Sequence, residues 1–248
     1  MDPAVLRDDM VDSLEHEAKG VISSDAVGLA MRTVPRHVFL EETHAAHADR
    51  EHRIAGTIVF APSTVARLVE ALAPDPNDRA LLVGAGVGYT AAVLAEIVGE
   101  RNVHAIELSG DITRLARRNL ADAGYDGVLV SQGDGAHGLG PYAPYDRILV
   151  ETAVVNPPRR LQDQLAPDGR MVLPLGAGIQ ELVAVEGDEV VRRFGSIAVE
   201  PMLLPGEESG AIERNRTRRE DREHAERAAQ RRQSLAHEWI DWDTDSPG

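Results

Sequence analysis

A glycine-rich turn between two apolar segments constrains the fold of this chain more than any other feature. Glycine occupies three alternate positions, Gly84, Gly86 and Gly88, directly after the apolar run of residues 80–83. A helix-forming run over residues 91–98 follows at once. Glycine lets a backbone turn sharply and lets a ligand lie against it, because glycine has no Cβ atom. The pattern therefore predicts a strand, a tight turn and a helix, with a ligand over the turn.

Two kinds of ligand suit such a turn, a dinucleotide or S-adenosylmethionine (AdoMet). The dinucleotide fingerprint needs a small residue one place after Gly88, where this chain has Tyr89. A Gly-x-Gly-x-Gly loop better suits AdoMet-dependent methyltransferases. Glu107 ends the next apolar run, and an acid at that place can hold the two ribose hydroxyls of an adenosine. We therefore expect a nucleotide-type cofactor; the competing interpretation is a structural glycine turn beside a solvated glutamate.

Length and composition favour one α/β domain with appended segments. The chain has 248 residues, 43% of them hydrophobic, and no run approaches the roughly eighteen apolar residues of a membrane span. The first ten residues are acidic and lack the apolar core of a signal peptide, so we expect a cytoplasmic protein without a membrane partner. The absence of cysteine excludes disulfides, thiolate metal sites and cysteine nucleophiles.

The charge of the chain is strongly acidic. Lysine and arginine number 26 and the acids 41, which gives a net charge of −15, and Lys19 is the only lysine. Such a composition is typical of proteins from salt-loving microbes, in which salt screens the self-repulsion. A GC-rich codon bias, which favours arginine over lysine, is the competing explanation. Nonspecific nucleic-acid binding needs a basic face, so we expect no nucleic-acid partner.

Strand and helix patterns alternate along most of the chain. Residues 1–36 favour two helices, the second capped by Ser24, and residues 36–40 favour an extended segment after Pro35. Ser63 is a candidate N-cap for the next helix. Further helices are expected at 65–72, 111–123 and 159–165, strands at 80–83, 103–107, 128–130, 145–150 and 170–175, and a hairpin at 180–186 and 190–197. This order predicts a Rossmann-like, mostly parallel sheet with antiparallel edge strands.

Two further polar features raise questions of ligand binding. Asp134 lies between two glycines at the end of the third strand, where the ligand crevice of an open α/β sheet is found. We favour a role in holding an adenine amino group over that of a simple turn aspartate. His44, His47 and His52 lie in a polar segment that has no strand or helix to aim their rings. We expect solvated loop histidines and no metal site.

From residue 207 the composition changes to a dense mixture of both charge signs. This pattern predicts a solvated helix with an acidic end. Leu235, Trp239 and Trp242 form a stripe at helical spacing that can dock on the body or on an unknown partner. We therefore divide the chain into an N-terminal helical and substrate-side region (1–56), a cofactor-binding α/β domain (57–206) and a charged helical tail (207–248).

Taken together, short motifs spread over roughly residues 20–200 resemble the protein-L-isoaspartate O-methyltransferase family. The matching segments are 34–40, 48–50, 56–58, 84–95, 124–125, 133–135, 143–146, 164–165 with 169–170, 174–176 and 180–182. The resemblance implies a class I AdoMet methyltransferase that esterifies isoaspartyl carboxylates in damaged proteins, which starts their repair. The residues that it implies for the cofactor are Gly84, Ala85, Gly86, Gly88, Glu107, Leu108, Asp134 and Gly135.

The chain departs from the family pattern at two places. Family members usually carry a serine after the Thr-Ile pair, and this serine is the residue usually assigned to catalysis. Here Val59 and Phe60 follow Thr57-Ile58, with one extra residue and no serine before the Ala-Pro pair. Leu82 replaces the acid that usually precedes the glycine loop, which removes one cofactor contact.

The missing serine need not abolish methyl transfer. A carboxylate acceptor has a pKa of about 4 and is ionised near pH 7, so it requires no general base. The rate must then come from holding oxygen, methyl and sulfur in line. Thr57, Ser63 or Thr64, or a backbone N–H group, can orient the carboxylate in place of the serine. Two alternatives stay open: methyl transfer to another acceptor, and a noncatalytic AdoMet-binding paralogue that acts as a protein partner.

Overall fold

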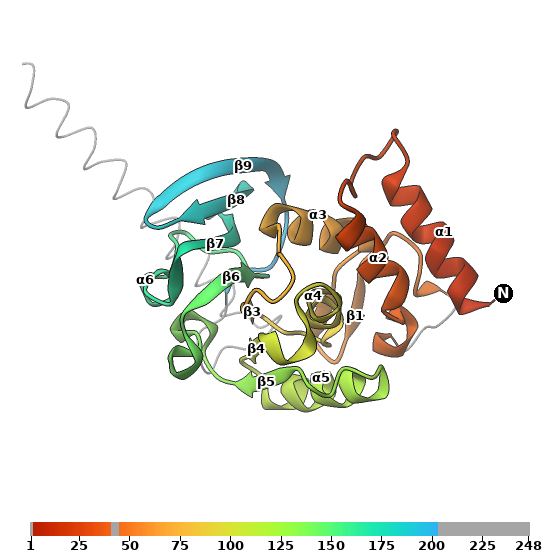
Figure 1. The fold of residues 1–248 in the computed structure, drawn as a ribbon, viewed down its shortest axis with the longest axis horizontal. Helices are drawn as coiled ribbons and strands as arrows, with labels where there is room; N and C mark the ends of the chain where they lie inside the picture. Colours follow the sequence, from red (N-terminus) through yellow and green to blue (C-terminus); the bar gives the residue numbers. More distant parts are fainter. Residues whose placement is uncertain (1, 41–44, 203–248) are drawn as a thin grey trace, which may run out of the picture.

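A seven-stranded sheet forms the centre of the protein (Figure 1). The computed structural model describes residues 2–40 and 45–202. The strand order is β5-β4-β3-β6-β7-β8-β9, in which the first five are parallel and β8 and β9 are antiparallel. The strands are β3 (Ala80–Val83), β4 (Val103–Glu107), β5 (Leu129–Gln132), β6 (Tyr145–Val150), β7 (Leu165–Leu175), β8 (Gln180–Glu186) and β9 (Glu189–Ile197). The predicted Rossmann-like sheet with antiparallel edge strands is confirmed.

The direction of strand addition reverses in the middle of this sheet. The chain builds β3, β4 and β5 outward on one side, and then returns to place β6 and β7 on the other side of β3. Val83 of β3 and Val150 of β6 are register partners at the reversal. Ligands of open α/β sheets bind beyond the carboxyl ends of the strands at such a switch point. The residues that follow these two strands are therefore placed at a ligand crevice.

The described residues form six α-helices: the last four pack against the sheet, the second packs on two of these four, and the first packs on the second. They are α1 (Pro3–Glu15), α2 (Asp25–Thr33), α3 (Pro62–Leu72), α4 (Tyr89–Val98), α5 (Gly110–Asp122) and the short α6 (Arg159–Gln162). Ser24 caps α2 as predicted, because its side chain accepts a hydrogen bond from the Val27 N–H group. Helices α1 and α2 share one buried cluster with α3, α4, α5 and the sheet. The first residues of the chain thus belong to the main core.

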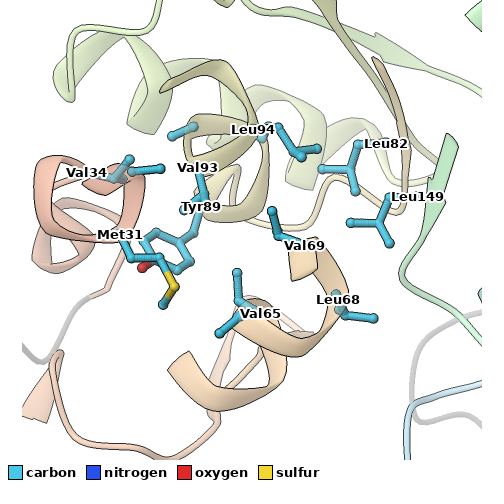
Figure 2. Packing of buried hydrophobic residues seen from close by; sticks show 14 of the residues in the cluster. Met31, Val34, Val65, Leu68, Val69, Leu82, Tyr89, Val93, Leu94 and Leu149 are labelled. Carbon is cyan, nitrogen blue, oxygen red and sulfur yellow. The ribbon is translucent and has the colours of Figure 1, made fainter. Parts of the chain in front are cut away.

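Helix α4 lies at the centre of this core, between α2 and α3 (Figure 2). Ten buried side chains of the cluster are labelled there: Met31, Val34, Val65, Leu68, Val69, Leu82, Tyr89, Val93, Leu94 and Leu149. Because α4 begins directly after the glycine turn, its burial fixes the turn against the edge of the sheet. A smaller cluster on the opposite face joins Leu161 of α6 to the other sides of the same strands.

A two-stranded hairpin stands apart from the main sheet. It consists of β1 (His52–Ile54) and β2 (Thr57–Val59), joined by Ala55 and Gly56. Both turn residues have positive φ, 50° and 85°, as a two-residue type I′ turn requires. This local geometry brings Thr57 and Ile58 to the carboxyl edge of the main sheet, where they line a cavity with the glycine turn.

Three predicted local structures are wrong in detail. Residues 36–40 are not extended, because Arg36–Phe39 form a 3-10 turn. Ser63 is not an N-cap: α3 begins one residue earlier at Pro62, and the Ser63 N–H group donates to Asp49 Oδ1 at 2.9 Å. Proline suits a first helical position because its missing N–H group would have no helical partner there. The helix expected at 159–165 ends at Gln162, since Leu165 pairs with Tyr145 in the sheet.

The predicted charged tail, with its leucine and tryptophan stripe, lies outside the described residues. Within residues 2–40 and 45–202, no helix has both the length and the apolar character that crossing a lipid bilayer requires.

Candidate functional site

A cavity of about 870 Å³ lies at the carboxyl edge of the parallel strands. The ends of β3, β4, β5 and β6 form its floor, and the β1–β2 hairpin and residues 200–202 also line it. Seven residues predicted for the site lie in its lining: Thr57, Gly84, Gly86, Glu107, Leu108, Asp134 and Gly135. Segments far apart in the sequence therefore meet where the switch point places a ligand.

Two of the three glycines in the turn face this cavity. Gly84 and Gly86 have φ values of 92° and 51°, which residues with side chains rarely adopt. A Cβ atom on Gly86 would stand 3.8 Å from Oγ1 of Thr57, and one on Gly84 would stand 3.6 Å from the Glu151 Cβ atom. Methyl groups there would fill the space between the turn and its neighbours, so the bare backbone keeps the cavity open.

The third glycine, Gly88, and Ala85 serve the fold instead of lining the cavity. A Cβ atom on Gly88 would stand 3.1 Å from Cγ of Leu120, so this glycine lets α4 begin close against α5. Ala85 is buried, and its N–H group donates to the carbonyl oxygen of Ile106 at 3.1 Å. Both residues shape the turn from behind.

Glu107 is fixed at the end of β4 by two backbone donors. Its Oε2 atom accepts from the Gly86 N–H group at 3.0 Å, and its Oε1 atom accepts from the Ser109 N–H group at 3.1 Å. Hydrogen bonds to an ionised carboxylate are stronger than neutral ones. A carboxylate has about four acceptor sites, so capacity remains for two hydroxyl donors of a ligand.

Asp134 acts as a turn residue and also lines the cavity. Its Oδ1 atom accepts from the Ala136 N–H group at 2.9 Å and caps a 3-10 turn, Gly135–His137. A Cβ atom on Gly135 would stand only 2.5 Å from Cγ1 of Val83. Glycine is therefore required for this turn to approach β3, which brings Asp134 to the same cavity as Glu107.

Glu151 also lines the cavity, although it was not among the predicted site residues. It directly follows β6, and its N–H group donates to the Val83 carbonyl oxygen at 2.9 Å. Its Oε1 atom is shielded from water and has no hydrogen-bond partner. Burial raises the pKa of this carboxyl group to about 8; a hydrogen bond from Thr90 opposes the rise, and the charge of Glu107 adds to it. An acid directly after the strand beside β3 is the sequence signal that would have identified it.

The predicted substrate-side hydroxyls fall into two groups. Thr57 lies on β2 and lines the cavity, whereas Ser63 and Thr64 lie in the first turn of α3 and are not among the lining residues. Leu82 is fully buried in the core, on the strand that leads to the glycine turn.

Two of the three loop histidines differ from the expectation of solvated loop rings, since His52 is half-buried at the start of strand β1. His47 is only 8% exposed, and burial, followed by the charges of His37, Arg7 and Arg36, lowers its pKa to about 4. It therefore packs as a neutral ring. His44 lies outside the described residues. Within the described part of the chain, no group of three or more His, Cys, Asp or Glu side chains is arranged to hold a metal ion.

A buried arginine holds the segment that leads into the cavity. Arg36 is fully buried, and its Nε and Nη2 atoms donate to the carbonyl oxygens of Ala46 at 2.8 Å and Phe60 at 2.7 Å. Its guanidinium group lies 4.5 Å from the ring centroid of Tyr89, the first residue of α4. Desolvation lowers the pKa of Arg36. The Arg36 side chain therefore joins Ala46 and Phe60 to helix α4, which follows the glycine turn.

The fold and the cavity together define a Rossmann-like α/β protein of the class I methyltransferase type, with its ligand site at the carboxyl edge of the sheet. The sequence profile of the protein-L-isoaspartate(D-aspartate) O-methyltransferase family matches residues 7–198. The chain therefore belongs to this family.

Individual relatives support the same assignment. The chain is 44% identical to the protein-L-isoaspartate O-methyltransferase of Aeropyrum pernix, over 80% of this chain and 78% of that protein. It is 42% identical to that of Methanopyrus kandleri, over 82% of this chain and 92% of that protein. A solved protein-L-isoaspartate O-methyltransferase superposes with a TM-score of 0.70 at 27% identity, covering 85% of this chain and 69% of that structure.

A second solved structure has a similar fold at lower identity. It is a putative protein-L-isoaspartate O-methyltransferase from Plasmodium falciparum in complex with S-adenosyl-L-homocysteine. Its TM-score is 0.71 at 20% identity, covering 79% of this chain and 98% of that structure.

Proposed function

We propose that this protein transfers a methyl group from AdoMet to the carboxylate of L-isoaspartyl residues in damaged proteins, as a step in their repair. The observation that carries the proposal is the family match over residues 7–198, which includes the ends of all four strands that form the cavity floor. The protein or peptide that bears the isoaspartate is its partner in the reaction.

The lining of the cavity fits AdoMet in charge and in hydrogen bonding. AdoMet supplies an electrophilic methyl group on a positively charged sulfur. Acidic side chains line the cavity and suit a cation. We assign the ribose hydroxyls to Glu107 and the adenine amino group to Asp134, beside Leu108 and Gly135. Gly84 and Gly86 admit the ligand to the backbone, while Ala85 and Gly88 shape the turn.

The residues of this chain contribute orientation and not proton transfer. In the reaction, an oxygen of the acceptor carboxylate bonds to the methyl carbon as the methyl–sulfur bond breaks, and the bonding pair remains on sulfur. No proton moves, so no base is needed. We assign Thr57 to orienting the carboxylate, because its hydroxyl stands over Gly86 at the cavity. Ser63 and Thr64 are the alternative hydroxyls, which would have to act from the start of α3.

Labelled methyl transfer tests this function. The protein is incubated with methyl-labelled AdoMet and either an isoaspartyl peptide or the matching aspartyl peptide. Label in the isoaspartyl peptide alone supports the proposal. Label in neither peptide, with transfer to a different carboxylate or small molecule, identifies another acceptor. AdoMet binding without transfer to any acceptor identifies a noncatalytic binding protein.

We also propose that the protein works in a salt-rich cytoplasm. The support is the net charge of −15 with a single lysine. Like charges interact over about 30 Å at 0.01 M salt but only about 3 Å at 1 M. The melting temperature should therefore rise strongly between these salt levels. Equal melting in both would contradict the proposal.

The assignment of separate roles to three segments of the chain is likewise a proposal. Residues 1–56 would form the helical, substrate-side region and residues 57–206 the cofactor-binding domain. Residues 207–248 would be a helical tail that docks on the body or on a partner. The only tryptophans, Trp239 and Trp242, lie in that tail, so their emission reports its docking. Blue-shifted emission in high salt is expected, and red-shifted emission at every salt level would show a tail free in solution.

A further inference from the structure

Among the described residues, four carboxylate side chains line the cavity, and Glu151 is the one with a buried oxygen that has no hydrogen-bond partner. Glu107 and Asp134 accept backbone hydrogen bonds, and Glu200 pairs with Arg53 at 3.2 Å. Glu151 has the Thr90 hydroxyl as a donor, but its Oε1 atom has no partner. No arginine, lysine or histidine occurs among the described residues that line the cavity. The cavity is therefore built for a ligand with positive charge.

An incompletely paired carboxylate is stable as a buried anion only when a cation or further donors join it. Glu151 lies at the cavity, where a ligand can provide the cation or the further donors. Its Cβ atom stands 3.6 Å from the place of a Cβ atom on Gly84, so the two residues share one wall of the cavity. Glu151 itself is one of the residues that line the cavity.

The strand order places Glu151 opposite the acid assigned to the ribose. Strands β4 and β6 lie on the two sides of β3. Strand β4 ends at Glu107, and Glu151 directly follows the last residue of β6. The two acids therefore bracket the glycine turn that follows β3. A ligand with two hydroxyls at one end and a cationic group at the other fits across this turn.

We propose that Glu151 binds the α-ammonium group of the methionyl end of AdoMet. This assignment rests on the proposed function. The ammonium group is the suitable cation because it offers three N–H donors, whereas the sulfonium offers none. A substrate carboxylate is excluded as the group held by the ionised side chain, because two anions in one cavity repel each other. The buried acid thus selects the amino-acid end of the methyl donor.

Calorimetry of Glu151→Gln with three ligands tests the assignment. AdoMet and S-adenosylhomocysteine both carry the ammonium group, whereas 5′-methylthioadenosine keeps the adenosine and the sulfur but lacks the amino-acid end. The variant should bind the first two roughly 10–100-fold more weakly, the loss expected for a charged hydrogen bond. It should bind 5′-methylthioadenosine within about twofold of the wild type. Glu189→Gln, an exposed acid outside the cavity, is the matched control and should bind all three ligands normally.

Each contrary result has a distinct meaning. Unchanged affinity for AdoMet in the variant overturns the role of Glu151 alone. Equal loss for all three ligands shows a structural effect on the cavity, and loss for AdoMet alone assigns Glu151 to the sulfonium; both overturn the ammonium assignment. Wild-type protein that binds none of the three ligands overturns this assignment together with the proposed function.

Discussion

The Nη2 atom of Arg36 donates a 2.7 Å hydrogen bond to the carbonyl oxygen of Phe60, a residue that lines the cavity. The same guanidinium group donates to Ala46 and lies over the Tyr89 ring. The buried Arg36 side chain thereby fixes three parts of the chain relative to one another: the loop at Ala46, the end of the β1–β2 hairpin and the start of α4. The substrate-side wall of the cavity depends on this side chain for its position.

Replacing Arg36 with methionine should destabilise the protein by about 2–5 kcal/mol, because two buried carbonyl oxygens lose their donors. Methionine keeps much of the side-chain volume, so the loss reports mainly on hydrogen bonding. Urea unfolding followed by circular dichroism measures it. Arg118→Met, at an exposed position on α5, should stay within about 0.5 kcal/mol of the wild type. Similar stability of the two variants would show that Arg36 does not organise the wall.

The regular elements of the sheet were predictable because their patterns are local. The strands at 80–83, 103–107 and 145–150 match β3, β4 and β6, since each is a short apolar run bounded by turn residues. The cap of α2 was predictable for the same reason, because Ser24 bonds to a residue three places away. Glu107 and Asp134 were predicted to meet at one cavity, since both end strands of one parallel sheet, and the structure brings them there.

Features that depend on distant partners were not predictable. Asp49 caps α3 from fourteen residues away, so the local serine was wrongly assigned to that role. His47 is neutral because of burial that only the tertiary fold creates. In the sequence, Gly88 cannot be distinguished from the other two glycines of the turn. Its position against Leu120 depends on how α4 and α5 pack. Glu151 lies beside the glycine turn because β6 pairs with β3 in the sheet, which is a relationship between distant parts of the chain.

Acid should destabilise the protein through His47 before the carboxylates are protonated. Its folded pKa of about 4 lies below the usual value of 6.5, so the unfolded chain binds the proton more readily. The stability from this group is therefore present above pH 6.5 and is lost as pH falls from 6.5 to 4. In melting curves across this window, His47→Gln should show a smaller decline than the wild type, whereas His16→Gln, at an exposed position, should decline in parallel with it. An unchanged slope in His47→Gln would contradict a buried neutral ring.

Glu151→Gln should stabilise the ligand-free protein near pH 8. The pKa of Glu151 rises to about 8 in the folded state from an ordinary 4.5, so the folded state holds a proton that the unfolded chain releases. Stability is therefore lost as pH increases from 4.5 to 8, and the amide removes this loss. The melting temperature of the variant should exceed that of the wild type by about 2–4 °C per kcal/mol gained, and the gap should close near pH 4.5. A lower melting temperature at pH 8 would show that the carboxyl group supports the empty fold.

Glu107→Ala should weaken AdoMet binding by about 1–3 kcal/mol, because ligand hydroxyls and two backbone N–H groups lose their acceptor. Calorimetry of the wild type and the variant measures the change, and Glu189→Ala is the control outside the cavity. Equal affinity of the wild type and Glu107→Ala would remove the ribose assignment. Binding of NAD in place of AdoMet by the wild type would reject the cofactor itself.

Initial rates of methyl transfer to an isoaspartyl peptide, with the aspartyl peptide as control, test the central claim most directly. The wild type should methylate the isoaspartyl peptide alone. A variant in which Val59-Phe60 is replaced by one serine, which restores the length and the hydroxyl of the family pattern, should be faster if the missing serine limits the rate. Robust transfer to the isoaspartyl peptide is the result that this account predicts. Transfer to another acceptor, with none to isoaspartate in either protein, would contradict it.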